Sequence, residues 1–254
     1  MSATGRTLLR VECRKLARAG VVRVATLAVL LLTATTTVGG FLAASHAPGT
    51  DIGQKAAGMM AAPGWAGYVG LAGTAIGICS LLAAGIVMAW SMGREFTDGT
   101  AVALLTLPAR PAAVASAKMA AALVWVLVLA VAETLLVTLG GLALGLPATG
   151  APPAAAAVLV VGVLLGVSAL PVMWVATVER GYLAGIGATL GIVVITNLTA
   201  GFGLGAVIPW AVPVLWAAPG EAVPTALLAL PAGVSVAGAL LTRRAWTRLE
   251  LGDR

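Results

Sequence analysis

Residue types that carry catalysis or bind metals are scarce in this chain, and their spacing forms no site. His46 is the only histidine, which excludes a His-pair metal site, and no plausible Ser-His-Asp arrangement is visible. Cys13 lies in a basic segment and Cys79 in an apolar run, and they form no CxxC or Cys/His metal pattern. We therefore expect no catalytic residue, no metal site and no enzymatic activity in this chain.

A nucleotide-binding P-loop is also excluded. A Walker A loop requires Gly-Lys followed by Ser or Thr. The chain has three lysines, Lys15, Lys55 and Lys118, and none of them follows a glycine. We therefore expect no cofactor in this chain, so any ATP that it uses must be bound by a partner.

The long polar interruption of the apolar sequence runs from residue 93 to residue 118 and reads GREFTDGTAVALLTLPARPAAVASAK. Thr97 or Asp98 can cap a short helix whose apolar face includes Leu104 and Leu105. Apolar runs long enough to cross a bilayer lie on either side. We interpret this segment as a cytoplasmic loop whose short helix meets a soluble partner. An interfacial helix that only joins two spans is the alternative.

Composition places the chain in a membrane. Of its 254 residues, 60% are hydrophobic and 9% are charged, with a mean hydropathy of +1.05. Soluble domains carry roughly 25% charged residues, because polar groups must cover their surface. The net charge of +6 would suggest nucleic acid in a soluble protein, but here the basic residues flank apolar spans. We expect an all-α integral membrane protein and no nucleic-acid partner.

Hydropathy predicts one transmembrane domain over residues 1–254 with six spans. They cover residues 24–44, 65–90, 119–146, 154–178, 182–200 and 225–241. The second span repeats small residues at three- or four-residue steps, at Gly67, Gly70, Gly73 and Gly77, which favours close helix packing. Pro171 predicts a kink in the fourth span.

Residues 1–23 form a basic segment with a helical period. Arg6, Arg10, Arg14 and Arg18 recur at every fourth residue and line one side of a helix. This pattern predicts an amphipathic helix in the interface, with its basic face towards anionic lipid headgroups. A plain basic tail that only sets the topology is the alternative.

The segment 201–224 is apolar but broken by four prolines and several glycines. Each proline removes a backbone hydrogen bond, so a regular spanning helix is excluded. We interpret it as a broken hydrophobic hairpin before the sixth span. A re-entrant hairpin and an outer loop with tryptophans at the headgroups are equally open.

Basic residues fix the orientation. With the N-terminus inside, an even number of spans places 14 of the 15 Lys and Arg residues on the cytoplasmic side, and Lys55 outside. The positive-inside rule therefore predicts a multi-pass protein of the plasma membrane with both termini cytoplasmic.

Two polar residues fall inside spans. Glu133 lies within the third span, where an ionisable group suggests function by default. Its other interpretation is a buried hydrogen bond to a threonine or backbone carbonyl of a neighbouring span, as the neutral acid. Asn197 lies near the far end of the fifth span.

The 93–118 segment resembles the corresponding loop of ABC-2-type transporter permeases, the membrane subunits of bacterial ABC exporters. The resemblance rests on Glu95, Gly99-Thr100, Leu104-Leu105, Pro108 with Arg110, and Lys118, and on the architecture of the whole chain. At Ala109-Arg110-Pro111 the chain departs from the family pattern, because relatives often have more basic residues there, so the resemblance supports the class and does not define the docking contacts.

The resemblance implies an ATP-driven exporter in the bacterial plasma membrane. A second permease copy or a paralogue would pair with this chain, and two separate ATPase subunits would bind ATP and Mg beneath them. The residues that would couple to the ATPases are Arg94, Glu95, Phe96, Asp98, Gly99, Thr100, Leu104 and Leu105. The N-terminal helix would flank this contact, and membrane lipids would surround the spans. The second and fifth spans would line the path, near the glycine face and Asn197.

Two other functions stay open at this point. One is an ion-coupled secondary transporter, which needs an intramembrane ionisable network. The other is a non-transporting immunity or scaffold membrane protein. The substrate, a drug, an antimicrobial peptide or a lipid-like molecule, cannot be read from the residues.

Overall fold

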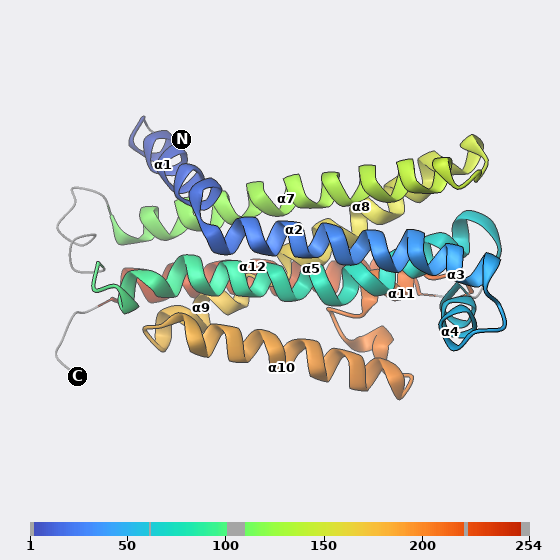
Figure 1. Cartoon of the computed structure of the whole chain (residues 1–254). Helices are drawn as coiled ribbons and strands as arrows, with labels where there is room; N and C mark the ends of the chain where they lie inside the picture. The colour runs from blue at the N-terminus through green and yellow to red at the C-terminus, as the bar shows by residue number, and fades with distance from the viewer. Residues whose placement is uncertain (1–2, 61, 101–109, 221–222, 250–254) are drawn as a thin grey trace.

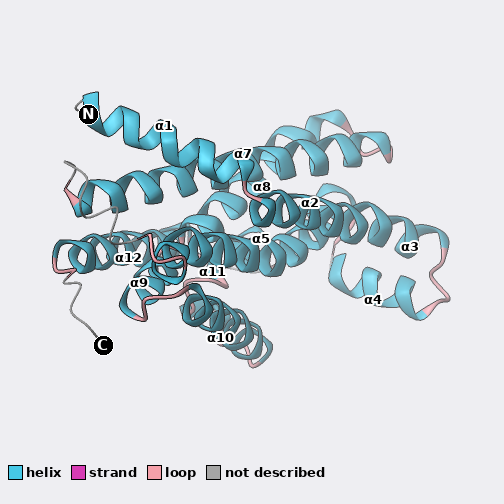
Figure 2. Ribbon diagram, turned by 60° about the vertical axis from the view of Figure 1, so that its left-hand side comes forward, coloured by secondary structure: helices cyan, strands magenta, loops and turns pink. Residues whose placement is uncertain are grey.

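The computed structural model describes residues 3–60, 62–100, 110–220 and 223–249, and within these ranges the chain is helical, with no β-strand (Figures 1 and 2). Six helical runs are long and apolar enough to cross a membrane. They are Gly20–His46, Gly64–Thr97, Pro111–Ala143, Ala148–Val178, Tyr182–Gly201 and Thr225–Thr247. The all-helical fold with six candidate spans that hydropathy predicts is confirmed.

Most of these runs contain one long helix, and two are interrupted. The helices are α2 (Gly20–Ala34), α3 (Gly40–His46), α5 (Gly64–Thr97), α7 (Pro111–Ala143), α8 (Ala151–Val167), α9 (Pro171–Val178), α10 (Tyr182–Gly201) and α12 (Ala229–Thr247). A π-helical turn, Thr35–Gly39, joins α2 to α3. Short 3-10 turns, Ala148–Gly150 and Thr225–Leu228, precede α8 and α12.

Helix α5 is the centre of the bundle. It contacts α2, α7, α8, α9 and α10, and its Ile76, Met88 and Met92 side chains have no exposed surface. Its 34 residues make a rod of roughly 51 Å at 1.5 Å per residue, longer than the ~30 Å apolar core of a bilayer. The helix therefore continues seven residues past Trp90, and Arg94, Glu95 and Phe96 lie on its last turns.

The fourth span is broken where Pro171 lies. Helix α8 ends at Val167, three residues form a turn, and α9 begins at Pro171, which has no N–H to donate. The Val172 N–H bonds to the Ala169 carbonyl, so the Ser168 carbonyl has no partner within its own span. Trp210 Nε1 donates to that carbonyl at 3.1 Å.

The segment before the sixth span is irregular, as its prolines predict. It contains a 3-10 turn, Gly205–Val207, and one short helix, α11 (Val212–Ala217), which contacts α5 and α8. Val214 lies so close to Gly77 that a Cβ there would be 2.9 Å from its Cγ2 atom. The glycine face of α5 therefore receives this segment.

One helix was not expected from the sequence. The predicted spans leave out residues 45–64, but α4 (Asp51–Met60) forms within them and packs on α3 and α5. Thr50 Oγ1 accepts a hydrogen bond from the Gly53 N–H at 3.2 Å and satisfies a donor of the first turn. A short helix between glycine and proline residues leaves too weak a periodic signal to be recognised.

Helix α1 (Ala3–Arg18) lies obliquely to the long helices and packs against α7 (Figure 1). Its Leu16 is buried, whereas its four arginines at every fourth residue are exposed. In both views α1 lies towards the end of the bundle where α12 ends, and α4 lies at the opposite end (Figures 1 and 2).

Candidate coupling site

A buried ion cluster joins three helices at the end of the bundle that carries α1. Lys118 Nζ of α7 lies 2.6 Å from Glu95 Oε1 of α5 and 3.0 Å from Glu12 Oε2 of α1. It also donates to the Ser91 carbonyl at 3.2 Å. Lys118 is 1% exposed, Glu95 4% and Glu12 5%. Three ionisable side chains from three helices therefore share one site shielded from water.

A fourth charge balances the cluster. Lys15 Nζ lies 2.8 Å from Glu12 Oε1 and 3.6 Å from Glu95 Oε1, and its side chain is partly exposed. Two carboxylates and two ammonium groups have no formal net charge. Buried charges are tolerated only when they are paired and hydrogen-bonded, so removing one member would leave an uncompensated charge.

The chain positions this cluster by helix periodicity. Glu12 and Lys15 are three residues apart on α1 and therefore lie on one face. Glu95 lies on the last turns of α5, and Lys118 is the eighth residue of α7. The cluster thus joins the end of α5 to the start of α7 and fastens both to α1.

Around Glu95, the chain leaves α5 in an ordered turn. Thr100 Oγ1 donates to Glu95 Oε2 at 2.6 Å. Gly99 has a φ of +69°, a left-handed conformation that favours glycine after a helix end. The two residues of the Gly99-Thr100 pair therefore have separate roles. Gly99 allows the turn, and Thr100 donates a hydrogen bond to the buried carboxylate of Glu95.

The predicted coupling residues divide into buried and exposed groups. Glu95 faces the cluster, and the Phe96 ring meets Trp246 of α12 edge-on at 6.0 Å. Arg94 lies over the Trp90 ring at 4.6 Å and is 4.0 Å from Asp98. The exposed stretch is Thr97, Asp98, Gly99 and Thr100. Leu104 and Leu105 lie outside the described residues.

The sequence interpretation did not identify Glu12 and Lys118 as partners. They are 106 residues apart, and no local period connects them. A signal was present, because Glu12 is the one acid among the six basic residues of positions 1–23, and Lys118 directly precedes an apolar run.

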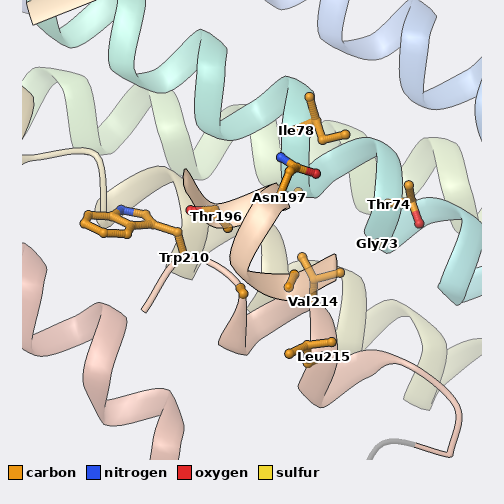
Figure 3. Close-up of a pocket in the computed structure, with 11 residues that line it drawn as sticks. Gly73, Thr74, Ile78, Thr196, Asn197, Trp210, Val214 and Leu215 are labelled. Atoms are coloured by element: carbon orange, nitrogen blue, oxygen red, sulfur yellow. The ribbon is translucent and has the colours of Figure 1, made fainter. Parts of the chain in front are cut away.

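The residues that were expected along the translocation path line a pocket (Figure 3). A pocket of about 190 Å³ lies between α5, α10 and the 201–224 segment. Gly73 and Gly77 of α5, Asn197 of α10, and Trp210 contribute to its wall. Asn197 Nδ2 donates to the Val193 carbonyl of its own helix, so its side-chain oxygen is left for another donor.

Comparison with protein families matches residues 8–197 to the ABC-2 family transporter proteins. The chain belongs to the ABC-2 transporter family. No curated protein matches it. The family match runs from α1 to α10, so it contains the ion cluster and Glu133 and ends at Asn197, before α11 and α12.

In this ABC-2 transporter, Glu133 joins three of the spans. Its Oε1 accepts from Ser80 Oγ of α5 at 2.6 Å and from Thr33 Oγ1 of α2 at 3.4 Å. The side chain is 1% exposed, and its Oε2 has no hydrogen-bond partner among the described residues. The hydrogen bond to a threonine of a neighbouring span, expected from the sequence, is present. No described Lys or Arg forms an ion pair with Glu133, and Lys118 on the same helix is roughly 22 Å away at 1.5 Å per residue.

The arginines of α1 face away from the transporter's core. Arg6, Arg10, Arg14 and Arg18 are exposed, and Leu8, Leu9 and Cys13 are partly buried on the opposite side. This two-sided arrangement leaves the basic face available to other molecules.

Proposed function

We propose that this ABC-2 permease is the membrane subunit of an ATP-driven exporter and couples to separate ATPase subunits through the segment between α5 and α7. Family membership supports a transporter permease. The observation that carries the coupling proposal is the cluster of Glu12, Glu95 and Lys118, because it fastens both ends of this segment to the rest of the protein.

A coupling element needs an exposed contact surface and a rigid base. The stretch from Thr97 to Thr100 is exposed and projects from the end of α5, whereas Glu95 and Lys118 directly beneath it are buried. A displacement of the exposed stretch would therefore pass to α5 and α7 together, and through Glu12 to α1. Since α5 contacts α2, α7, α8, α9 and α10 among other helices, the same movement would reach the bundle interior.

A pocket beside α5 suggests where substrate passes. The pocket beside Gly73, Gly77 and Asn197 lies on the face of α5 that meets α10. We propose that this face lines the translocation path in a pair of permeases, with a second copy or a paralogue. The orientation follows from the basic residues, with both termini in the cytoplasm of a bacterial cell.

Charge reversal on the exposed stretch tests the coupling. The permease would be coexpressed with a candidate ABC ATPase partner, with Asp98→Lys as the test variant and Asp51→Lys, on α4 at the other end of the bundle, as the matched control. We expect Asp98→Lys to reduce ATPase co-purification and ATP hydrolysis by the assembled complex, and Asp51→Lys to leave both unchanged. Equal binding and hydrolysis in the two variants would contradict the proposal.

A further inference from the structure

A second pocket lies between α1, α7 and α12, apart from the pocket proposed for the transport path and next to Arg110, the last residue of the segment between α5 and α7. Its volume is about 440 Å³. Gly5 and Leu9 of α1 line one side, and Arg243 of α12 closes another. In Figure 1 the start of α7 lies beneath α1, which leans away from it. Residues of both helices line the pocket.

The α7 wall of this pocket is one stripe of small side chains. Ala113, Ser116, Ala117 and Ala120 recur at three- or four-residue steps and therefore share one face of the helix. With Leu9 opposite, they make a largely apolar wall. One hydroxyl, that of Ser116, lies on it and donates to the Ala112 carbonyl of its own helix.

Two unpaired positive charges border this apolar wall. Arg110, just before α7, and Arg243 of α12 both line the pocket and are exposed. Neither guanidinium has an ion pair or hydrogen bond with any residue in the described ranges, and no acidic residue lines the pocket. By contrast, Lys118 and Lys15 nearby are neutralised by Glu12 and Glu95. Within the part of the chain that the structure describes, the positive charge of this pocket is therefore uncompensated.

We propose that this pocket binds an anionic phospholipid, with the phosphate between Arg110 and Arg243 and the glycerol and first acyl carbons along the α7 stripe. Guanidinium groups bind phosphate oxygens in a planar, bidentate geometry. A membrane lipid fits better than a soluble phosphate because the wall is apolar and belongs to a candidate membrane span. Basic pockets between helices at the cytoplasmic side are typical lipid-headgroup sites.

Lipid retention is measured on the permease alone, so this test needs no ATPase partner and its failure is distinguishable from a failure of ATPase coupling. The purified permease would be reconstituted with mixed phosphatidylglycerol and phosphatidylcholine, re-extracted in detergent, and analysed for retained lipid by native mass spectrometry. The test variant is R110Q/R243Q. The matched control is R244Q/R248Q, which removes the same charge from exposed arginines at the end of α12 that do not line the pocket.

We expect the wild type and the control to retain phosphatidylglycerol in preference to phosphatidylcholine. We expect R110Q/R243Q to lose most of this preference. Equal retention by the two double variants would overturn the proposal. Displacement of the lipid by millimolar inorganic phosphate would also overturn it, because the site would then be one for a soluble anion. Thermal unfolding of each variant separates loss of lipid from loss of fold, and single R110Q and R243Q variants replace the double variant if it does not fold.

Discussion

Lys118 Nζ lies 2.6 Å from Glu95 Oε1, although 23 residues separate them in the sequence. The pair closes the base of the segment between α5 and α7, and Glu12 extends it to α1. A contact residue suggested by a family motif is therefore an interior residue of the permease, and its charge serves the permease itself.

Removing the cation of this cluster should be strongly destabilising. Lys118→Met keeps much of the side-chain volume but leaves Glu12 and Glu95 buried without Lys118, with only the partly exposed Lys15 to balance them. Breaking a buried ion pair from one side costs about 3–5 kcal/mol, and we expect a loss of that order in thermal unfolding in detergent. Adding Glu95→Gln should recover part of it. Asp98→Asn, which removes an exposed pair, should change little. A Lys118→Met protein as stable as the wild type would show that the cluster contributes nothing.

Glu133 should tolerate an amide better than an apolar side chain. Glu133→Gln keeps an oxygen that can accept from Ser80 and Thr33, whereas Glu133→Leu leaves both hydroxyls without this acceptor. We expect Glu133→Leu to lose about 1–3 kcal/mol of unfolding free energy and Glu133→Gln much less. Thermal unfolding compares the two. If the glutamine variant keeps its stability but loses transport, the carboxyl group itself has a function beyond joining the helices.

The close contact between α5 and α10 should be sensitive to one methyl group. A Cβ on Gly93 would lie 2.3 Å from the Tyr182 backbone nitrogen, so Gly93→Ala must separate the end of α5 from the start of α10. Overpacking of this kind costs typically 1–3 kcal/mol. Gly187→Ala on α10, where no atom lies within 4 Å, is the control. Equal melting temperatures for the two variants would mean that the helices separate at no cost.

The N–H of Trp210 should contribute to stability. Trp210→Phe keeps an aromatic side chain but removes the donor to the Ser168 carbonyl. An unsatisfied buried acceptor costs about 1–3 kcal/mol. Trp216→Phe, whose bond to Thr225 is exposed, should lose less in the same unfolding experiment. A larger loss for Trp216→Phe would contradict this assignment.

Much of the architecture could be predicted from the sequence, because a helix that crosses a bilayer must be both long and apolar. Long apolar runs predict six spans, and Pro171 predicts a kink in the fourth, where the structure has a full break. The prolines of 201–224 predict the irregular path of that segment. These are local signals, and each depends on a few adjacent residues. The motif around Glu95 also indicated the family that the comparison identifies.

The interior of the candidate site could not be predicted in the same way. Glu95 looks exposed in a charged segment, and its burial depends on Lys118 and Glu12, which only the folded bundle brings close. Helix α5 likewise continues past Trp90 because Met92 packs in the core and Phe96 packs against it. Tertiary contacts decide both features, and no single stretch of sequence contains them.

The interrupted fourth helix also sets an order for biogenesis. As the ribosome delivers α8 and α9 to the membrane, the Ser168 carbonyl enters it without a backbone donor, and its partner Trp210 is synthesised 42 residues later. The hydrogen bond that satisfies this carbonyl in the folded protein can therefore form only after the segment that follows the fifth span has been made.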